Sequence, residues 1–344
     1  MADPKKVCIL SIDGGGIRGI LPGVILNALE EKLRAKKGDD ARIAHYFDLI
    51  AGTSTGGILS CAYLMPDDNG NPKFTAAEAV DLYLKRGGDI FNVSFKKKIL
   101  SVAGVTDEKY DERELEKALK DNFEDKWLSE LLKPCLITSY DIEGRDAFFL
   151  RQHKTDNDDH NFLIRDVARA TSAAPTYFEA SHIKSKAGNE YPLVDGGVFA
   201  NNPAMCAYSE ARTMTFEGKT DYPCVEDMMF VSVGTGGVKE PYMFDSAKDW
   251  GMLQWIQPVI DIMMSGNSET VRHQLKQIYG TLEGEDSRDY HRLEPSLGGA
   301  KSNMDDASDK NLKALENAGL SFVEDPRNSE ELDAIVEKLI RYNG

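Results

Sequence analysis

Cysteine is scarce in this chain of 344 residues, and the few cysteines lie far apart. There are five of them, none in a C-x-x-C pair: Cys8, Cys61, Cys135, Cys206 and Cys224. An odd number of widely spaced cysteines argues against a fold that is held together by disulfide bonds. We interpret most of these cysteines as small buried apolar residues, which is typical of a protein in a reducing compartment.

Long apolar runs are also missing. No stretch of about 18 apolar residues occurs, so no membrane span is expected. The N-terminal "MADPKKVCIL" has two lysines, but its apolar run is too short for the hydrophobic region of a signal peptide. These features predict a soluble, cytoplasmic protein.

The chain has no excess of positive charge. It contains 57 Asp and Glu against 41 Lys and Arg, which gives a net charge of -16. Phosphate groups would be repelled, so nucleic acid is not an expected partner and broad contact with an anionic membrane is disfavoured. Hydrophobic residues make up 41% of the chain, which is ample for a large core.

Apolar strand patterns alternate with helical patterns along most of the chain. Strands are predicted at 7–12, 46–52, 134–142, 147–152 and 228–234. Helices are predicted at 21–37, 56–65, 75–87, 111–123, 162–174 and 202–214. This alternation is typical of the α/β class, with a mostly parallel sheet and helices on both of its faces.

We expect a single domain over residues 1–344, because neither a repeat nor a linker composition interrupts the pattern. The motifs described below fall within 7–237, and 238–344 is predicted to be a helical C-terminal extension. Asn328 and Glu331 are predicted to form a capping box at the start of its last helix.

Residues 52–56 read Gly-Thr-Ser-Thr-Gly, which is a G-x-S-x-G pattern. It follows a predicted strand directly and opens a predicted helix, as a nucleophile elbow requires. The Ser54 hydroxyl would then stand at the helix N-terminus, whose positive end favours a developing alkoxide. A helix N-cap is the alternative, because Thr53, Ser54 and Thr55 are all capping residue types.

A serine nucleophile needs a base, and none of the six histidines fits that role. His45, for example, precedes the strand that leads to Ser54 and should lie at the opposite end of the sheet. Asp195 instead ends an apolar run before two glycines, and strand-end aspartates are well placed for chemistry in open α/β sheets. Burial would raise its pKa and strengthen it as a base. A simple turn at this aspartate is the alternative.

Three glycine motifs occur in the order "DGGGIRG" (13–19), "GTSTGG" (52–57) and "DGG" (195–197). Together with "VARATSAAPTYFEA" (167–180) and "VSVGTGG" (231–237), they resemble the patatin-like phospholipases. That family has a three-layer α/β/α sandwich with a mostly parallel central sheet, and it uses a Ser-Asp dyad without histidine. The resemblance implies the same fold here and accounts for the missing histidine.

The resemblance also implies roles for single residues. Ser54 would be the nucleophile and Asp195 the general base. The backbone N–H groups of Gly14, Gly15 and Gly16 would form the oxyanion hole, in which one donor is typically worth about 10²–10³ in rate.

Arg18, in the first glycine motif, would bind substrate by placing positive charge near its phosphate. A nucleotide phosphate loop is a rival interpretation of that motif, but no Lys-Ser/Thr follows the glycines. A purely structural glycine turn is the other alternative. The resemblance implies neither metal nor organic cofactor, and we interpret the acidic residues 156–160 as a solvated loop rather than a metal site.

The implied activity is that of a serine lipid acyl hydrolase of the phospholipase A type. It would cleave ester-linked fatty acids from membrane phospholipids through an acyl-enzyme, acting at the membrane surface. Two alternatives stay open: a thioesterase or transacylase on the same scaffold, and an antiviral phospholipase effector activated by a cyclic nucleotide. A homo-oligomer is a further open expectation.

Two segments are candidates for contact with lipid. In 91–104, "FNVSFKKKILSVAG", lysines stand among large apolar residues, which suits docking on anionic lipid, with a solvated turn as the alternative. For 250–264, "WGMLQWIQPVIDIMM", the Met and Trp content favours core or a subunit interface over a lipid surface.

Overall fold

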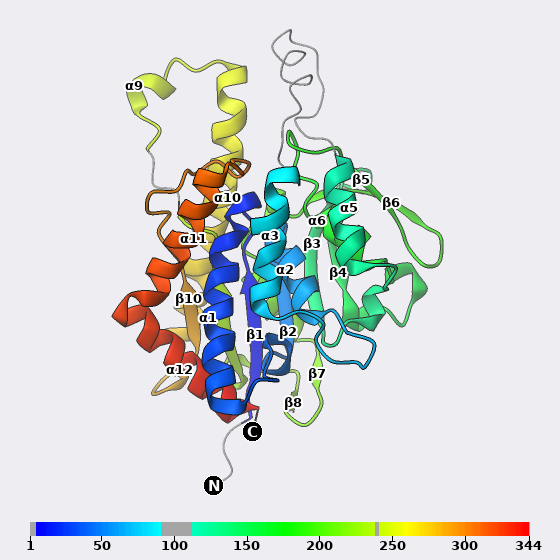
Figure 1. Cartoon of the computed structure of the whole chain (residues 1–344), viewed down its shortest axis with the longest axis vertical. Coiled ribbons are helices and arrows are strands. Elements are labelled where there is room, and N and C mark those ends of the chain that lie inside the picture. Colours follow the sequence, from blue (N-terminus) through cyan, green and yellow to red (C-terminus); the bar gives the residue numbers. More distant parts are fainter. Residues whose placement is uncertain (1–4, 91–111, 238–240, 344) are drawn as a thin grey trace.

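An eight-stranded sheet forms the centre of the computed structural model, which describes residues 5–90, 112–237 and 241–343 (Figure 1). The strand order is β10-β9-β1-β2-β3-β6-β5, and β4 pairs with β3 outside that path. The strands are β1 (Val7–Ile12), β2 (Leu49–Thr53), β3 (Cys135–Asp141), β4 (Asp146–Arg151), β5 (Ser181–Lys184), β6 (Glu190–Asp195), β9 (Met228–Val233) and β10 (Tyr290–Leu293). A separate small sheet pairs β7 (Thr215–Phe216) with β8 (Thr220–Asp221).

The five neighbouring strands from β10 to β3 run parallel to one another. In contrast, β4 and β6 run antiparallel to β3, and β5 runs antiparallel to β6. The central strands β1 and β9 are buried along their whole length, as parallel strands covered on both faces should be. The predicted α/β class with a mostly parallel sheet is confirmed.

Helices cover both faces of this sheet (Figure 1). They are α1 (Ile20–Lys37), α2 (Thr55–Leu64), α3 (Ala76–Ile90), α5 (Glu112–Phe123), α6 (Ile164–Thr171), α7 (Gly197–Ala200), α8 (Ala204–Ala211), α9 (Phe244–Ala247), α10 (Met252–Tyr279), α11 (Asp309–Glu324) and α12 (Pro326–Tyr342). Successive side chains of β1 enter different cores, because residues alternate across a strand. Cys8, Leu10 and Ile12 pack in the core of α1, α2 and α11, whereas Val7 and Ile9 pack in the core of α8 and α10. The expected three-layer α/β/α sandwich is therefore present.

The segment 282–312, polar and rich in loop residues, contributes a strand that its sequence does not predict. β10 pairs in parallel with β9 and extends the sheet beyond it. His291 and Leu293 are buried while Arg292 is partly exposed, so the strand alternates, but only half of its side chains are apolar. The described part of the predicted helical extension thus contains the helices α9 to α12, this strand and the loops that connect them.

The predicted capping box at the start of α12 is wrong. The helix begins at Pro326, and its N-cap is Asp325, whose carboxylate accepts hydrogen bonds from the N–H groups of Arg327 and Asn328. Asn328 therefore lies inside the first turn, and Pro at the first helical position fixes where the helix begins.

The two segments considered for lipid contact have different outcomes. Residues 91–104 lie outside the described part of the chain. For 250–264 the sequence favours core or a subunit interface, and core is wrong for the outward-facing side chains, since Met252 is 86% exposed and Met263 is 52% exposed. The subunit interface stays a prediction. Among the described residues, no helix has both the length and the apolar character needed to cross a bilayer.

Candidate active site

Ser54 lies on the sharp turn between β2 and α2. Its backbone has φ 54° and ψ -122°, which is strained for a residue that carries a side chain. The Ser54 N–H donates to the Thr171 hydroxyl at 2.8 Å, and that hydroxyl donates to the Thr138 carbonyl at 2.7 Å. The Ser54 hydroxyl makes no capping hydrogen bond to α2, so this geometry fits an elbow and not an N-cap.

Glycines flank the turn because the backbone of α2 runs against the end of β1. A Cβ placed on Gly56 would lie 2.7 Å from the carbonyl carbon of Ile12 and 2.8 Å from the carbonyl oxygen of Asp13. A Cβ on Gly52 would lie 2.5 Å from the carbonyl carbon of Gly56. Any larger residue at position 52 or 56 would push strand and helix apart.

Asp195, the last residue of β6, is 5% exposed and lies beside Ser54 on the wall of one cavity. Burial raises the pKa of Asp195 to about 6, against the opposing effects of hydrogen bonds from the Ser54 hydroxyl and the Gly197 N–H. The Gly197 N–H is 2.7 Å from the carboxylate and fixes its orientation. The structure thus brings together a serine hydroxyl and a carboxylate that is a stronger base than an exposed one.

The three glycines after β1 do not have equivalent N–H groups. The Gly14 N–H donates to the Asn201 carbonyl at 3.0 Å, so it is already occupied, contrary to the expectation that all three N–H groups face substrate. Gly15 and Gly16 line the cavity, and neither N–H donates to another described residue. Two backbone donors therefore remain at this end of the cavity.

The N–H groups of Gly15 and Gly16 belong to peptide units whose carbonyl oxygens, those of Gly14 and Gly15, accept hydrogen bonds. The Thr235 hydroxyl donates to the Gly14 carbonyl at 2.7 Å. The Arg18 Nε and backbone N–H donate to the Gly15 carbonyl at 3.3 and 3.2 Å. Because these two peptide bonds are trans, each carbonyl points away from the N–H of its own peptide unit, so the hydrogen bonds fix the directions of the Gly15 and Gly16 N–H groups.

Arg18 is not where its predicted role in binding substrate would place it. It is buried, it does not line the cavity, and its Nη1 donates to the Gly236 carbonyl at 3.4 Å. The guanidinium thus ties the glycine loop to the segment after β9. A direct contact with a substrate phosphate is not supported by this position.

A buried ion pair fixes the start of the glycine loop. Asp13 accepts hydrogen bonds from Arg292 Nη1 at 2.9 Å and Nη2 at 2.6 Å, and it is 2% exposed. Such two-point pairing is both strong and directional. It connects the end of β1 to β10, and no sequence signal singles out Arg292. Thr235, in contrast, lies in the "VSVGTGG" segment, which did carry a signal.

The cavity has a volume of about 160 Å³. Its apolar lining includes Ile58 of α2, Leu115 of α5, Phe178 after α6, Val198 of α7 and Met264 of α10. The lining includes much of residues 172–178. Thr55 also lines the cavity, whereas the Thr53 hydroxyl turns away and donates to the Ala200 carbonyl at 2.6 Å.

Histidine does not contribute to this cavity. All six histidines are among the described residues, and none of them lines it. His153 is paired with Glu210 at 2.8 Å, and His291 is paired with Glu331. Within residues 5–90, 112–237 and 241–343, no group of three or more His, Cys, Asp or Glu side chains is arranged to hold a metal ion.

Comparison with known proteins gives a consistent result. The family model described as patatin-like phospholipase matches residues 10–208. Patatin-like protein 2 of Oryza sativa subsp. indica is 35% identical over 340 residues, which cover 92% of this chain and 83% of that protein. Patatin group J-1 of Solanum tuberosum is 31% identical over 356 residues, covering 98% and 89%. The crystal structure of VipD from Legionella pneumophila aligns with a TM-score of 0.42 and 14% identity, covering 96% of this chain and 67% of that one.

The matched residues 10–208 include all three glycine motifs and the two residues that face each other in the cavity, Ser54 and Asp195. The relatives extend the match over nearly the whole chain, the C-terminal segment included. The chain therefore belongs to the patatin-like phospholipase family.

Proposed function

We propose that this protein is a serine lipid acyl hydrolase of the phospholipase A type, with Ser54 as nucleophile and Asp195 as general base. One observation carries the proposal. A serine hydroxyl on a strained turn and a buried carboxylate meet on the wall of an apolar cavity. Membership of a family described as patatin-like phospholipases supports the choice of lipid esters as substrates.

In the first step the Ser54 oxygen attacks the carbonyl carbon of the ester, and its proton passes to Asp195. An exposed aspartate is a weak base for this task, with a pKa of about 4. Burial raises the pKa of Asp195 to about 6, which makes the carboxylate a better proton acceptor. The N-terminus of α2, at which Ser54 lies, stabilises the oxygen as it becomes negative.

The tetrahedral intermediate places negative charge on the former carbonyl oxygen. The N–H groups of Gly15 and Gly16 are the donors proposed to bind it, and Gly14 is left out because its N–H is bonded to Asn201. Donors that are already oriented stabilise this charge without reorganisation. Thr235 and Arg18 supply that orientation from the carbonyl side.

Collapse of the intermediate breaks the ester bond. The alcohol leaves with the proton held by Asp195, and the acyl group stays on Ser54. Water then attacks the acyl-enzyme, Asp195 accepts its proton, and the fatty acid is released when the proton returns to Ser54. These steps use only groups of this chain, and the apolar cavity provides space for the acyl chain.

Replacing Ser54 by alanine tests the proposal. We expect Ser54→Ala to lower the release of fatty acid from phosphatidylcholine vesicles by about 10⁴-fold or more, since the nucleophile is lost. Ser172→Ala is the matched control, because Ser172 also lines the cavity but its hydroxyl already donates to the Ala168 carbonyl at 2.7 Å. The control should keep most of the activity.

Two further arms of the same assay address the alternatives. Hydrolysis of an acyl thioester but of no phospholipid would replace the proposed substrate class by that of a thioesterase. Wild-type protein is expected to be active without an added nucleotide, and activity that depends on a cyclic nucleotide would favour the effector alternative. Undiminished hydrolysis by Ser54→Ala would refute the assignment of the nucleophile.

A further inference from the structure

Exposed apolar side chains are concentrated in one part of this molecule. Of the eleven large hydrophobic residues that are exposed in the described chain, eight lie between positions 242 and 263. We call them the α9–α10 surface: Tyr242, Met243, Phe244, Met252, Trp255, Val259, Ile262 and Met263. Such a concentration marks a surface that is covered in use, because scattered single residues would need no explanation.

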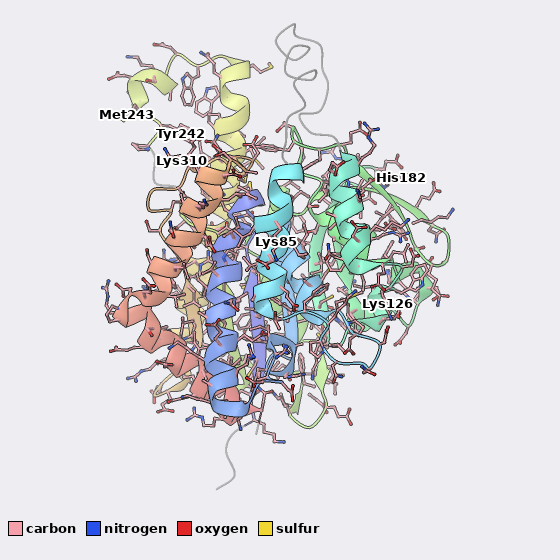
Figure 2. All side chains as sticks on the ribbon, viewed as in Figure 1. Lys85, Lys126, His182, Tyr242, Met243 and Lys310 are labelled. Atoms are coloured by element: carbon pink, nitrogen blue, oxygen red, sulfur yellow. The ribbon has the colours of Figure 1, made fainter. Side chains whose placement is uncertain are left out.

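The surface stands clear of the body of the molecule. In Figure 1, α9 and the first turns of α10 rise above the other helices, and Figure 2 places Tyr242 and Met243 in this projecting part. Phe244 is 78% exposed and Met252 is 86% exposed, so both leave most of their side chain in water.

Four of the eight residues of the α9–α10 surface form a stripe along α10. Met252, Trp255, Val259 and Ile262 follow one another at intervals of three and four residues along α10, so they share one face of the helix. The preceding chain is packed onto this helix. Trp250 contacts the rings of Tyr242 and Trp255, with centroids 5.6 and 5.1 Å apart. The projection is therefore an ordered apolar structure rather than a loose loop.

The surface reaches the cavity that contains Ser54. Met263 belongs to both, since it is 52% exposed and lines the cavity, and Ile260 and Met264 of the same helix line the cavity as well. An apolar path thus leads from the projecting turns to the nucleophile. A second copy of the chain bound to this surface would cover the entrance of the cavity. A lipid layer bound there would instead bring its acyl chains to that entrance.

The charges of the segment indicate which kind of lipid it suits. Residues 241–264 contain three aspartates and a single lysine. That lysine, Lys248, is paired with Asp245 at 3.0 Å. With a net charge of -16 over the whole chain, attraction to anionic headgroups is not available here. Apolar burial must supply the binding free energy.

We propose that the α9–α10 surface docks on the surface of a zwitterionic phospholipid layer and delivers acyl chains to the cavity. The choice of a lipid as occupant rests on the proposed function. Trp255 and Tyr242 would lie at the headgroup level, where such rings are favoured, and Phe244 and Met252 would enter the apolar region.

The test separates docking from catalysis. Binding is measured by co-sedimentation with phosphatidylcholine vesicles in the Ser54→Ala background, so that the vesicles are not consumed. The test variant adds Phe244→Ser and Met252→Ser, neither of which lines the cavity. The matched control adds Ile142→Ser and Leu320→Ser, which are 44% and 43% exposed elsewhere on the molecule.

We expect the test variant to lose about tenfold or more in vesicle affinity for each apolar side chain removed, and the control to bind as its parent does. With Ser54 restored, the test variant should hydrolyse vesicles slowly but a short monomeric ester at the normal rate. Adding phosphatidylserine to the vesicles should not strengthen binding.

Several results would overturn the docking proposal. One is the absence of binding to phosphatidylcholine vesicles, and another is binding that requires anionic lipid. The proposal would also fail if the test variant bound vesicles as well as its parent does, or if the control variant lost as much vesicle affinity as the test variant. A wild-type dimer that the test variant dissociates, with vesicle binding unchanged, would assign the surface to a second copy instead. If Ser54→Ala kept its hydrolytic activity while docking depended on Phe244 and Met252, the catalytic proposal would fail and the docking proposal would stand.

Discussion

Two cavities of this molecule differ in a way that size alone does not reveal. The larger one, about 670 Å³, is lined by charged residues of β10 and α12 and of the segment before β10. The smaller one, about 160 Å³, is apolar and contains Ser54 and Asp195. By volume the charged cavity would be the first candidate for a functional site.

The side chains of the charged cavity are largely engaged with one another. His291 is paired with Glu331, Arg341 with Glu285 at 3.6 Å, and Lys338 with the buried Asp289 at 2.8 Å. Charges that satisfy each other hold β10 and α12 in place and leave little for a ligand to bind.

The apolar cavity has the opposite character. Most of its polar lining is also engaged, as the Tyr83 hydroxyl donates to the Thr55 carbonyl at 2.8 Å. What remains is a serine beside a carboxylate, the Thr55 hydroxyl, and the N–H groups of Gly15 and Gly16. A few uncompensated polar groups in apolar surroundings indicate chemistry better than many charges in a large hollow.

The largest effect after loss of the nucleophile is expected for Asp195→Asn. The amide keeps the shape and can still accept from the Gly197 N–H, but it cannot take a proton. We expect kcat/KM for a lipid ester to fall by about 10²–10⁴, the usual contribution of a general base. Asp141→Asn, at the end of the neighbouring strand β3 and outside the cavity, is the matched control. A variant at position 195 within twofold of wild type would mean that another group is the base.

Thr235→Val should have the next largest effect. Valine keeps the shape of threonine but removes the bond to the Gly14 carbonyl, which leaves the Gly15 N–H less well directed. Loss of a whole oxyanion donor costs about 10²–10³, so a loosened donor should lower kcat by roughly tenfold with KM little changed. Thr235→Ser retains the hydroxyl and should restore the rate. If valine and serine behaved alike, packing rather than this hydrogen bond would explain the position.

The pH dependence of hydrolysis tests whether the buried carboxylate in the apolar cavity acts as the base. Asp195 must be ionised to accept a proton, and burial raises its pKa to about 6. Protonation therefore removes activity as the pH falls below about 6, by about tenfold per unit, and activity stays level above that point. The measurement is kcat/KM for an uncharged soluble ester between pH 4.5 and pH 8, roughly two units to either side of this value. A profile that stays level down to pH 5 would show that the base titrates like an exposed carboxylate.

The sequence predicts those parts of the site that are local. Ser54 directly follows β2 and Asp195 is the last residue of β6, both near glycines, so their positions follow from short stretches of chain. Gly38 likewise has φ 103° and follows the end of α1, where the predicted helix 21–37 also ends. Such features depend on the backbone conformations that a few neighbouring residues can adopt.

Contacts between distant segments could not be predicted in this way. The carbonyl that occupies the Gly14 N–H belongs to Asn201, and the guanidinium that pairs with Asp13 belongs to Arg292 on an unpredicted strand. Arg18 is bonded to the Gly236 carbonyl instead of reaching the cavity. The Met and Trp content of 250–264 favours core or a subunit interface, but the exposure of this helix could not be predicted, because periodicity does not tell which neighbours a helix will have.

The smallest effect on activity is expected for Lys338→Met. This variant is also the most direct test of the comparison between the charged cavity and the apolar cavity. Methionine keeps most of the side-chain length but removes the charge that faces Asp289, whose carboxylate keeps its bond to Lys6 at 2.6 Å. Because this pair is largely buried, we expect the free energy of unfolding in urea to fall by about 1–3 kcal/mol. Lys36→Met, which breaks the exposed pair with Glu337, should cost less than about 1 kcal/mol. Hydrolysis by folded Lys338→Met should equal that of wild type. Loss of activity without loss of structure would mean that the charged cavity takes part in function and that the contrast between the two cavities is wrong.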